Sequence, residues 1–194
     1  MPRVHVELDV AIKPYTVYLA LHHRVHDPDG EFHWAIVISL ANWSSCVFFH
    51  ANNPDSFNPA LDSWVIEEWP PGQWTPWNSA TLLCMFELMT CNTQDLVAEK
   101  YAEILSAGQD IMARKSVSSF RQSQTFSCKT FVLDTLAQAI PTVSGQSSAD
   151  LETHASDAAK WTRDLAISTT GIPMVPGWFK IFKLEMVEPT SAEA

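Results

Sequence analysis

The run HWAIVISL at positions 33–40 is apolar nearly throughout, and only His33 and Ser39 are polar. A short continuous apolar run of this kind predicts a strand that is buried on both faces of a sheet. Upstream, YTVYLALHHR at 15–24 is rich in β-branched and aromatic residues, and DPDG at 27–30 is a strong turn signal. The two runs therefore predict a hairpin near the centre of a sheet.

Further strands and three helices are predicted around this hairpin. The additional strands cover positions 46–50, 63–68, 81–90 and 178–186. The hydrophobic period changes to 3.6 in helical segments at about 94–105, 128–139 and 150–167. The segment that ends at Pro14 shows neither period and is expected to be irregular. The predicted fold class is α+β, in which an antiparallel sheet packs against the helix that begins at Cys128.

The composition indicates one domain and excludes some partners. With 194 residues and 46% hydrophobic content, the chain suffices for a single domain over 1–194. Its core is expected at about 15–140, and the helix and strand at 150–187 complete it. A net charge of −10 with only 12 Lys and Arg argues against nucleic acid and anionic membranes. No stretch approaches the ~20 apolar residues of a membrane span, so we expect a cytoplasmic protein without an integral membrane segment. The oligomeric state stays open.

Cys128 is the strongest candidate nucleophile among the four cysteines. The cysteines show no C-x-x-C pairing, so neither a zinc site nor a disulfide framework is expected. Cys128 begins a predicted helix, where unpaired backbone N–H groups and the helix dipole stabilise a thiolate. Its own backbone N–H would supply half of an oxyanion hole. Cys84 and Cys91 lie in or beside an apolar strand and are expected in the core.

His33 is the candidate base, because it stands at the start of a central strand and would be held rigidly. His50, near the end of the next strand, is expected to pair with His33 and fix its tautomer. The other histidines of the hairpin, His22, His23 and His26, are interpreted as solvated strand-end residues. We therefore expect neither a metal site nor a cofactor.

Aromatic residues supply the candidate substrate-binding wall. Four tryptophans fall in one stretch interrupted by prolines, namely Trp64, Trp69, Trp74 and Trp77. Such a stretch is typical either of core packing or of an apolar pocket wall. We assign substrate contacts to Trp34, Trp74 and Trp77, and to Gln124 as a second oxyanion donor. Glu67 and Glu68 receive no role.

Three short motifs resemble a known family. HWAIVI at 33–38, VFFH at 47–50 and SCKTFV at 127–132 are similar to motifs of the lecithin:retinol acyltransferase-like proteins and small phospholipase-acyltransferases. These belong to the circularly permuted branch of the NlpC-type papain-like superfamily. The resemblance implies a permuted papain-like fold with catalytic residues His33, His50 and Cys128. Ser127 and Lys129-Thr130 depart from the family pattern of Asn before the cysteine and Glu-His after it. The connection between the two histidine strands is also longer than is usual in the family, so a shifted register would leave Ser45, Asn52 or Asn53 in place of His50.

The expected function is cysteine-dependent acyl transfer or hydrolysis. His33 would deprotonate Cys128, and the thiolate would attack an ester, thioester or amide of a small, largely apolar substrate, forming a thioester acyl-enzyme. The same cysteine motif also resembles permuted PPPDE-type peptidases, which act on ubiquitin-like conjugates. A third alternative is a non-catalytic protein on the same fold that binds a hydrophobic ligand.

Overall fold

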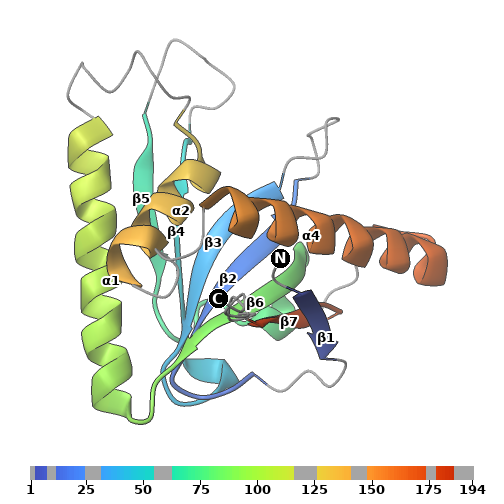
Figure 1. The fold of residues 1–194 in the computed structure, drawn as a ribbon, viewed down its shortest axis with the longest axis horizontal. Coiled ribbons are helices and arrows are strands. Elements are labelled where there is room, and N and C mark those ends of the chain that lie inside the picture. The colour runs from blue at the N-terminus through green and yellow to red at the C-terminus, as the bar shows by residue number, and fades with distance from the viewer. Residues whose placement is uncertain are drawn as a thin grey trace, which may run out of the picture.

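A seven-stranded sheet forms the centre of the structure, with the strand order β1-β7-β6-β2-β3-β4-β5 (Figure 1). The computed structural model describes residues 3–7, 12–24, 32–54, 63–115, 126–140, 148–173 and 178–185. The strands are β1 (Arg3–Glu7), β2 (Thr16–His23), β3 (Phe32–Ser39), β4 (Cys46–Asn52), β5 (Val65–Trp69), β6 (Leu82–Thr90) and β7 (Lys180–Glu185). The predicted β2–β3 hairpin therefore lies inside the sheet, with β6 and β4 as its neighbours.

The sheet is mixed, which corrects the expectation of an antiparallel one. Every neighbouring pair is antiparallel except β6 and β7, which run parallel. Parallel neighbours need a long crossover connection, and the three α-helices lie between β6 and β7 in the sequence. The segment before Pro14, expected to be irregular, contains β1, which pairs with β7. This short strand was missed because it forms only through pairing with the far end of the chain.

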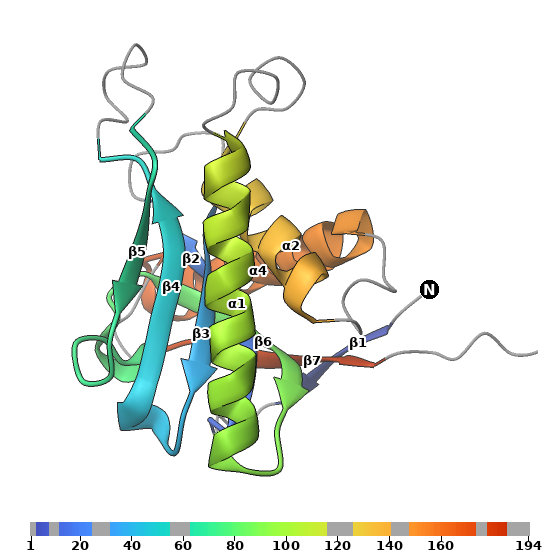
Figure 2. The same ribbon diagram turned by 90° about the vertical axis from the view of Figure 1, so that its left-hand side faces the viewer.

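In the described part of the chain, three α-helices cover one face of the sheet (Figure 2). They are α1 (Gln94–Lys115), α2 (Cys128–Ala139) and α4 (Ser148–Thr170). Helix α1 extends beyond the predicted 94–105 because Ala107 and Ile111 continue its buried stripe. The structure is thus α+β, as predicted. No described helix is long and apolar enough to cross a bilayer.

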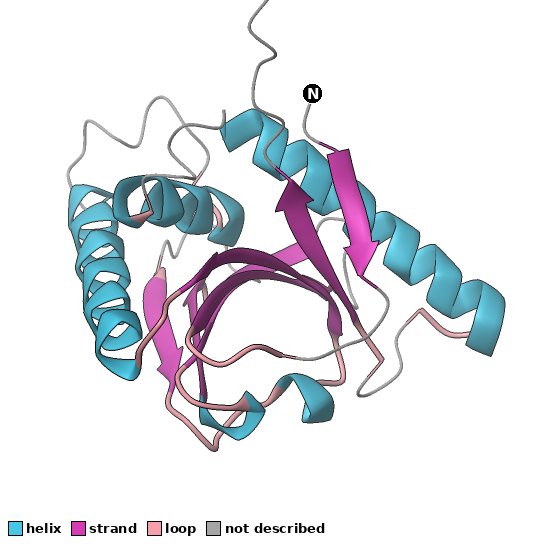
Figure 3. Ribbon diagram, turned by 60° about the horizontal axis from the view of Figure 1, so that its bottom comes forward, coloured by secondary structure: helices cyan, strands magenta, loops and turns pink. Residues whose placement is uncertain are grey.

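Strand β3 separates two apolar clusters because its side chains alternate between the faces of the sheet. Phe32, Trp34 and Ile36 join the cluster beneath the α-helices, which we call the helix-covered face. Ala35 and Val37 join the opposite cluster, which we call the loop-covered face. The two 3-10 helices, η1 (Trp43–Ser45) and η2 (Pro76–Asn78), lie on the side of the curved sheet away from the α-helices (Figure 3).

Gly108 lets α1 approach the sheet closely. A Cβ atom at this position would lie 2.7 Å from Phe49 Cζ and 3.1 Å from Phe131 Cζ. Both phenylalanines are fully buried, so their rings have little room to move. The absence of a side chain at Gly108 therefore sets the distance between α1 and β4.

We expect Gly108→Ala to destabilise the protein by about 1 kcal/mol. Overpacking costs roughly 1–3 kcal/mol, and the better helix propensity of alanine returns up to about 1 kcal/mol. Urea denaturation measures the change in unfolding free energy. Ser106→Ala, at an exposed position of α1, is the control and is expected to be neutral or slightly stabilising. A Gly108→Ala protein as stable as the Ser106→Ala protein would show that the contact with Phe49 does not constrain the fold.

Candidate functional site

Three histidines meet on the loop-covered face. His22, His33 and His50 lie on the adjacent strands β2, β3 and β4, and His22 is the register partner of His33. Each shares its strand face with members of the loop-covered cluster, because side chains two residues apart point the same way. The ring centroids of His22 and His33 are 6.3 Å apart, and those of His33 and His50 are 4.6 Å apart.

These histidines line a cavity of about 430 Å³, which we call the histidine pocket. The ring centroids of Phe48 and Trp69, which are stacked, are 4.9 Å apart, and those of Phe48 and Trp74 are 4.8 Å apart. The full lining is His22, His23, His33, Phe48, His50, Trp69, Trp74, Asn78, Ser79, Ala80 and Thr81. The pocket therefore combines aromatic walls with a few polar groups, as small-molecule sites commonly do.

A polar chain runs from the pocket to the edge strand β5. His33 Nε2 lies 2.7 Å from His50 Nδ1, so the predicted pairing of these residues is present. His50 Nε2 lies 3.2 Å from Glu67 Oε2, close enough for an ion-pair contact. The two atoms are not aligned for a hydrogen bond. His50 Nε2 is therefore buried without a hydrogen-bond partner among the described residues. We regard the contact as electrostatic.

His22 supplies the second buried nitrogen that has no hydrogen-bond partner among the described residues. His22 Nδ1 lies 3.1 Å from Thr81 Oγ1, whereas its Nε2 is buried without a hydrogen-bond partner in the described part of the chain. His22 is only 5% exposed, which corrects the expectation of a solvated strand-end histidine. It was missed because its burial depends on the wall formed by Phe48 and Trp74, which come from elsewhere in the sequence.

Burial keeps the three histidines neutral. It lowers the pKa of His22 and His33 to about 3 each, and that of His50 to about 4. Repulsion between the rings adds to the lowered pKa of His22 and His33. None of the described residues that line the pocket is Lys or Arg. The pocket is thus poor in formal charge at neutral pH.

The predicted substrate-binding residues are distributed over different parts of the structure. Trp74 lines the histidine pocket. Trp34 points to the helix-covered face and is buried there in the core. Trp77 is half-exposed and packs against Phe179, with ring centroids 5.0 Å apart. Gln124 lies outside the described residues. Of the three predicted substrate-binding residues that the structure describes, only Trp74 lies with His33 and His50.

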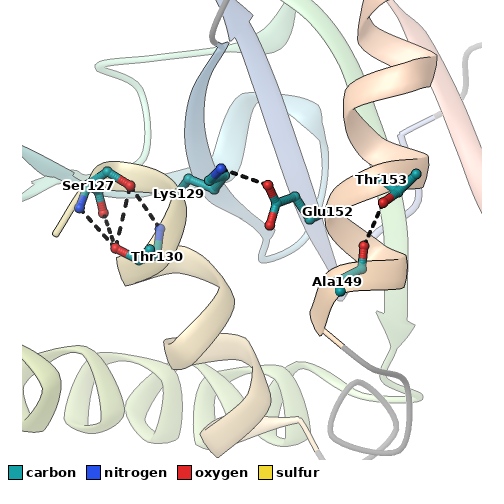
Figure 4. Close-up of polar contacts among 6 residues, drawn as sticks. All are labelled: Ser127, Lys129, Thr130, Ala149, Glu152 and Thr153. Atoms are coloured by element: carbon teal, nitrogen blue, oxygen red, sulfur yellow. Dashed lines mark hydrogen bonds and ion pairs between the residues drawn. The ribbon is translucent and has the colours of Figure 1, made fainter. Parts of the chain in front are cut away.

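Cys128 begins α2, as predicted, and is nearly fully buried. Ser127 caps the helix through reciprocal bonds with Thr130, in which Thr130 N donates to Ser127 Oγ and Ser127 N donates to Thr130 Oγ1 (Figure 4). Lys129 Nζ donates a hydrogen bond of 2.7 Å to Glu152 Oε1 and so connects the first turn of α2 to α4 (Figure 4). Arg24 Nη2 lies 3.7 Å from Cys128 Sγ.

Cys128 and His33 belong to opposite faces of the sheet. The cysteine joins the helix-covered cluster, whereas His33 lies with His50 on the loop-covered face. Both are near the hairpin end of β2 and β3, where Arg24 contacts the thiol and contributes to the lowered pKa of His33. A Cys128–His33 contact would thus have to pass around this end of the sheet.

Burial disfavours a reactive thiolate at the other three cysteines. Burial raises the pKa of Cys46 to about 11 and also raises the pKa values of Cys84 and Cys91. Cys84 and Cys91 are buried, so their predicted place in the core is confirmed. Among the described residues, no group of three or more His, Cys, Asp or Glu side chains is arranged to hold a metal ion.

We expect the buried neutral histidines to make the folded state less stable as the pH is lowered. The unfolded chain binds protons near the ordinary histidine pKa of 6.5, whereas the folded pKa of His22 is about 3. Stability from His22 is therefore complete above pH 6.5 and is lost as the pH falls toward 3. The loss between pH 7 and pH 5 is about 2 kcal/mol for one such residue.

Urea denaturation at pH 7 and pH 5 measures this dependence. His22→Phe is expected to reduce the loss between the two pH values by about 2 kcal/mol, because it removes one titrating ring. Phe48→Leu, which alters a ring next to His22 without a titrating group, should lower stability equally at both pH values. An unchanged pH dependence in His22→Phe would contradict the neutral state of His22.

The comparisons with known proteins leave the family open. No family model, no curated protein and no solved structure matches this chain. The resemblance to lecithin:retinol acyltransferase-like proteins, and the permuted papain-like fold that it implies, therefore stay predictions.

Proposed function

We propose that this protein binds a small, uncharged and largely apolar molecule in the histidine pocket. The observation that carries the proposal is the pocket itself, a cavity of about 430 Å³ lined by aromatic rings and by His22, His33 and His50. Apolar walls with a few polar groups are typical of small-molecule sites.

The charge state of the pocket supports an uncharged ligand. Its histidines are neutral because burial opposes their protonation, and the same burial opposes a cationic ligand. An anionic ligand would find neither Lys nor Arg among the described lining residues. Phe48, Trp69 and Trp74 offer aromatic surface instead, which favours a planar apolar body.

Titration with indole, followed by NMR, tests the proposal. We expect saturable shifts of pocket resonances in the wild type and binding about tenfold weaker in Trp74→Ala, because a wall is removed. Trp77→Ala, outside the pocket, and Cys128→Ser, on the other face, are expected to bind like the wild type. No saturable shift, or equal losses in Trp74→Ala and Trp77→Ala, would reject the pocket as the binding site.

As a second candidate, we propose cysteine-dependent acyl transfer or hydrolysis. The observation that favours it is the guanidinium of Arg24, 3.7 Å from Cys128 Sγ at the first turn of α2. A cation and a helix N-terminus both stabilise a thiolate relative to a thiol. The thiolate would attack the carbonyl of an ester, thioester or amide and form a thioester, releasing the alcohol, thiol or amine. Transfer to water or an amine would regenerate the thiol.

His33 is the base proposed for this second function: His50 holds its Nε2, and the ring would have to reach Cys128 around the end of β2 and β3 where Arg24 lies. Intact-mass measurement with an electrophilic acyl probe tests the assignment. We expect one added acyl group in the wild type, none in Cys128→Ala and slower labelling in His33→Ala. Cys46→Ala is the control and should label like the wild type, because burial raises the pKa of Cys46. Equal labelling of Cys128→Ala and wild type would exclude Cys128 as the nucleophile.

A further inference from the structure

A chain of polar side chains connects β5 to the histidine pocket. Asn52 Nδ2 donates a hydrogen bond of 2.8 Å to Glu67 Oε1. The other oxygen, Oε2, lies 3.2 Å from Nε2 of His50, the register partner of Glu67 on β4. His50 Nδ1 in turn lies 2.7 Å from His33 Nε2. This series of polar contacts ends at His33, which lines the pocket.

The carboxylate at one end of this chain determines where the protons lie. A neutral imidazole has one N–H and one lone pair, and an ionised carboxylate only accepts hydrogen bonds. Glu67 therefore stabilises the His50 tautomer with its proton on Nε2, because a lone pair there would face the carboxylate. His50 Nδ1 is then an acceptor, and the 2.7 Å contact requires a proton on His33 Nε2. His33 Nδ1 keeps its lone pair.

The main competitor for the His50 proton is the backbone of Ala51, which also favours the protonated ring of His50. Its carbonyl oxygen is uncharged, whereas the carboxylate of Glu67 lies 3.2 Å from His50 Nε2, where its charge attracts an N–H group and repels a lone pair. Asn52 strengthens the preference, because its bond to Oε1 leaves Oε2 to face His50. The carboxylate of Glu67 is thus the stronger influence on the His50 proton.

We propose that Glu67 is a positioning residue that sets the tautomers of His50 and His33, and that the ligand of the histidine pocket donates an uncharged N–H or O–H group to His33 Nδ1. The second half of this statement rests on the proposed binding function, whereas the first half does not. The ligand class is therefore a neutral aromatic molecule with a hydrogen-bond donor, such as an indole or a phenol.

Long-range proton–nitrogen NMR spectra at pH 7 test the tautomers without any ligand. In the wild type we expect His33 Nδ1 to appear as a nitrogen without a proton. In Glu67→Gln, Asn52 still holds Oε1, so the new amide N–H group faces His50 Nε2 and the proton order reverses. His33 Nδ1 is then expected to carry the proton.

Glu68→Gln, the next residue on β5, is the matched control and should keep the wild-type pattern. The proposal is overturned if His33 Nδ1 carries a proton in the wild type, or if Glu67→Gln leaves both tautomers unchanged. Because the spectra report ring protonation directly, a purely structural role of Glu67 would not reproduce the expected reversal.

Indole and benzofuran, which have nearly the same shape, test the ligand class. Indole donates an N–H, whereas benzofuran has an oxygen atom in its place. We expect the wild type to bind indole severalfold more tightly, since the hydrogen bond to His33 Nδ1 that benzofuran cannot make contributes roughly 0.5–1.5 kcal/mol. This advantage should disappear in Glu67→Gln and persist in Glu68→Gln. Equal wild-type affinities would overturn the donor requirement while the binding function stands, and binding of neither probe would overturn both.

Discussion

The structure depends on the burial of β3 on both of its faces. Its large residues, such as Trp34 and Ile36, support the three α-helices, and its small ones, such as Ala35, leave space on the other side. A shift of one residue would exchange these two sets, so the register of β3 is strongly specified. The same alternation directs His33 away from the helices and toward His22 and His50. The position of the histidine pocket is therefore a consequence of how the core is packed.

Much of the fold could be predicted because it rests on local periodicity. Within the described residues, the alternating and continuous apolar runs located six of the seven strands, and the 3.6 period located α1, α2 and α4. Strand β1 and the parallel pairing of β6 with β7 could not be predicted, because both depend on where the C-terminal strand inserts. The local pattern of a strand does not show which distant strand it pairs with.

The candidate site shows the same division between local and long-range information. The pairing of His33 with His50 could be predicted because the two residues lie on the same face of neighbouring strands. The position of Cys128 could be predicted from the start of its helix. The place of Glu67 beside His50 was missed, and Asn52 was considered only as a substitute for His50, since both contacts depend on the register between β4 and β5. A register estimate for that hairpin would have placed Glu67 opposite His50 and drawn attention to it.

The sheet also explains why the thiol and the pocket are best considered separately. Cys128 and His33 lie on opposite faces, and the described residue that interacts with both is Arg24, at the end of the hairpin. The positive charge of Arg24 lowers the pKa of His33 through space. Burial and the neighbouring His50 lower the pKa of His33 more than Arg24 does, so the state of the pocket is set mainly on its own face of the sheet. A change at Cys128 is therefore expected to leave the pocket largely as it is.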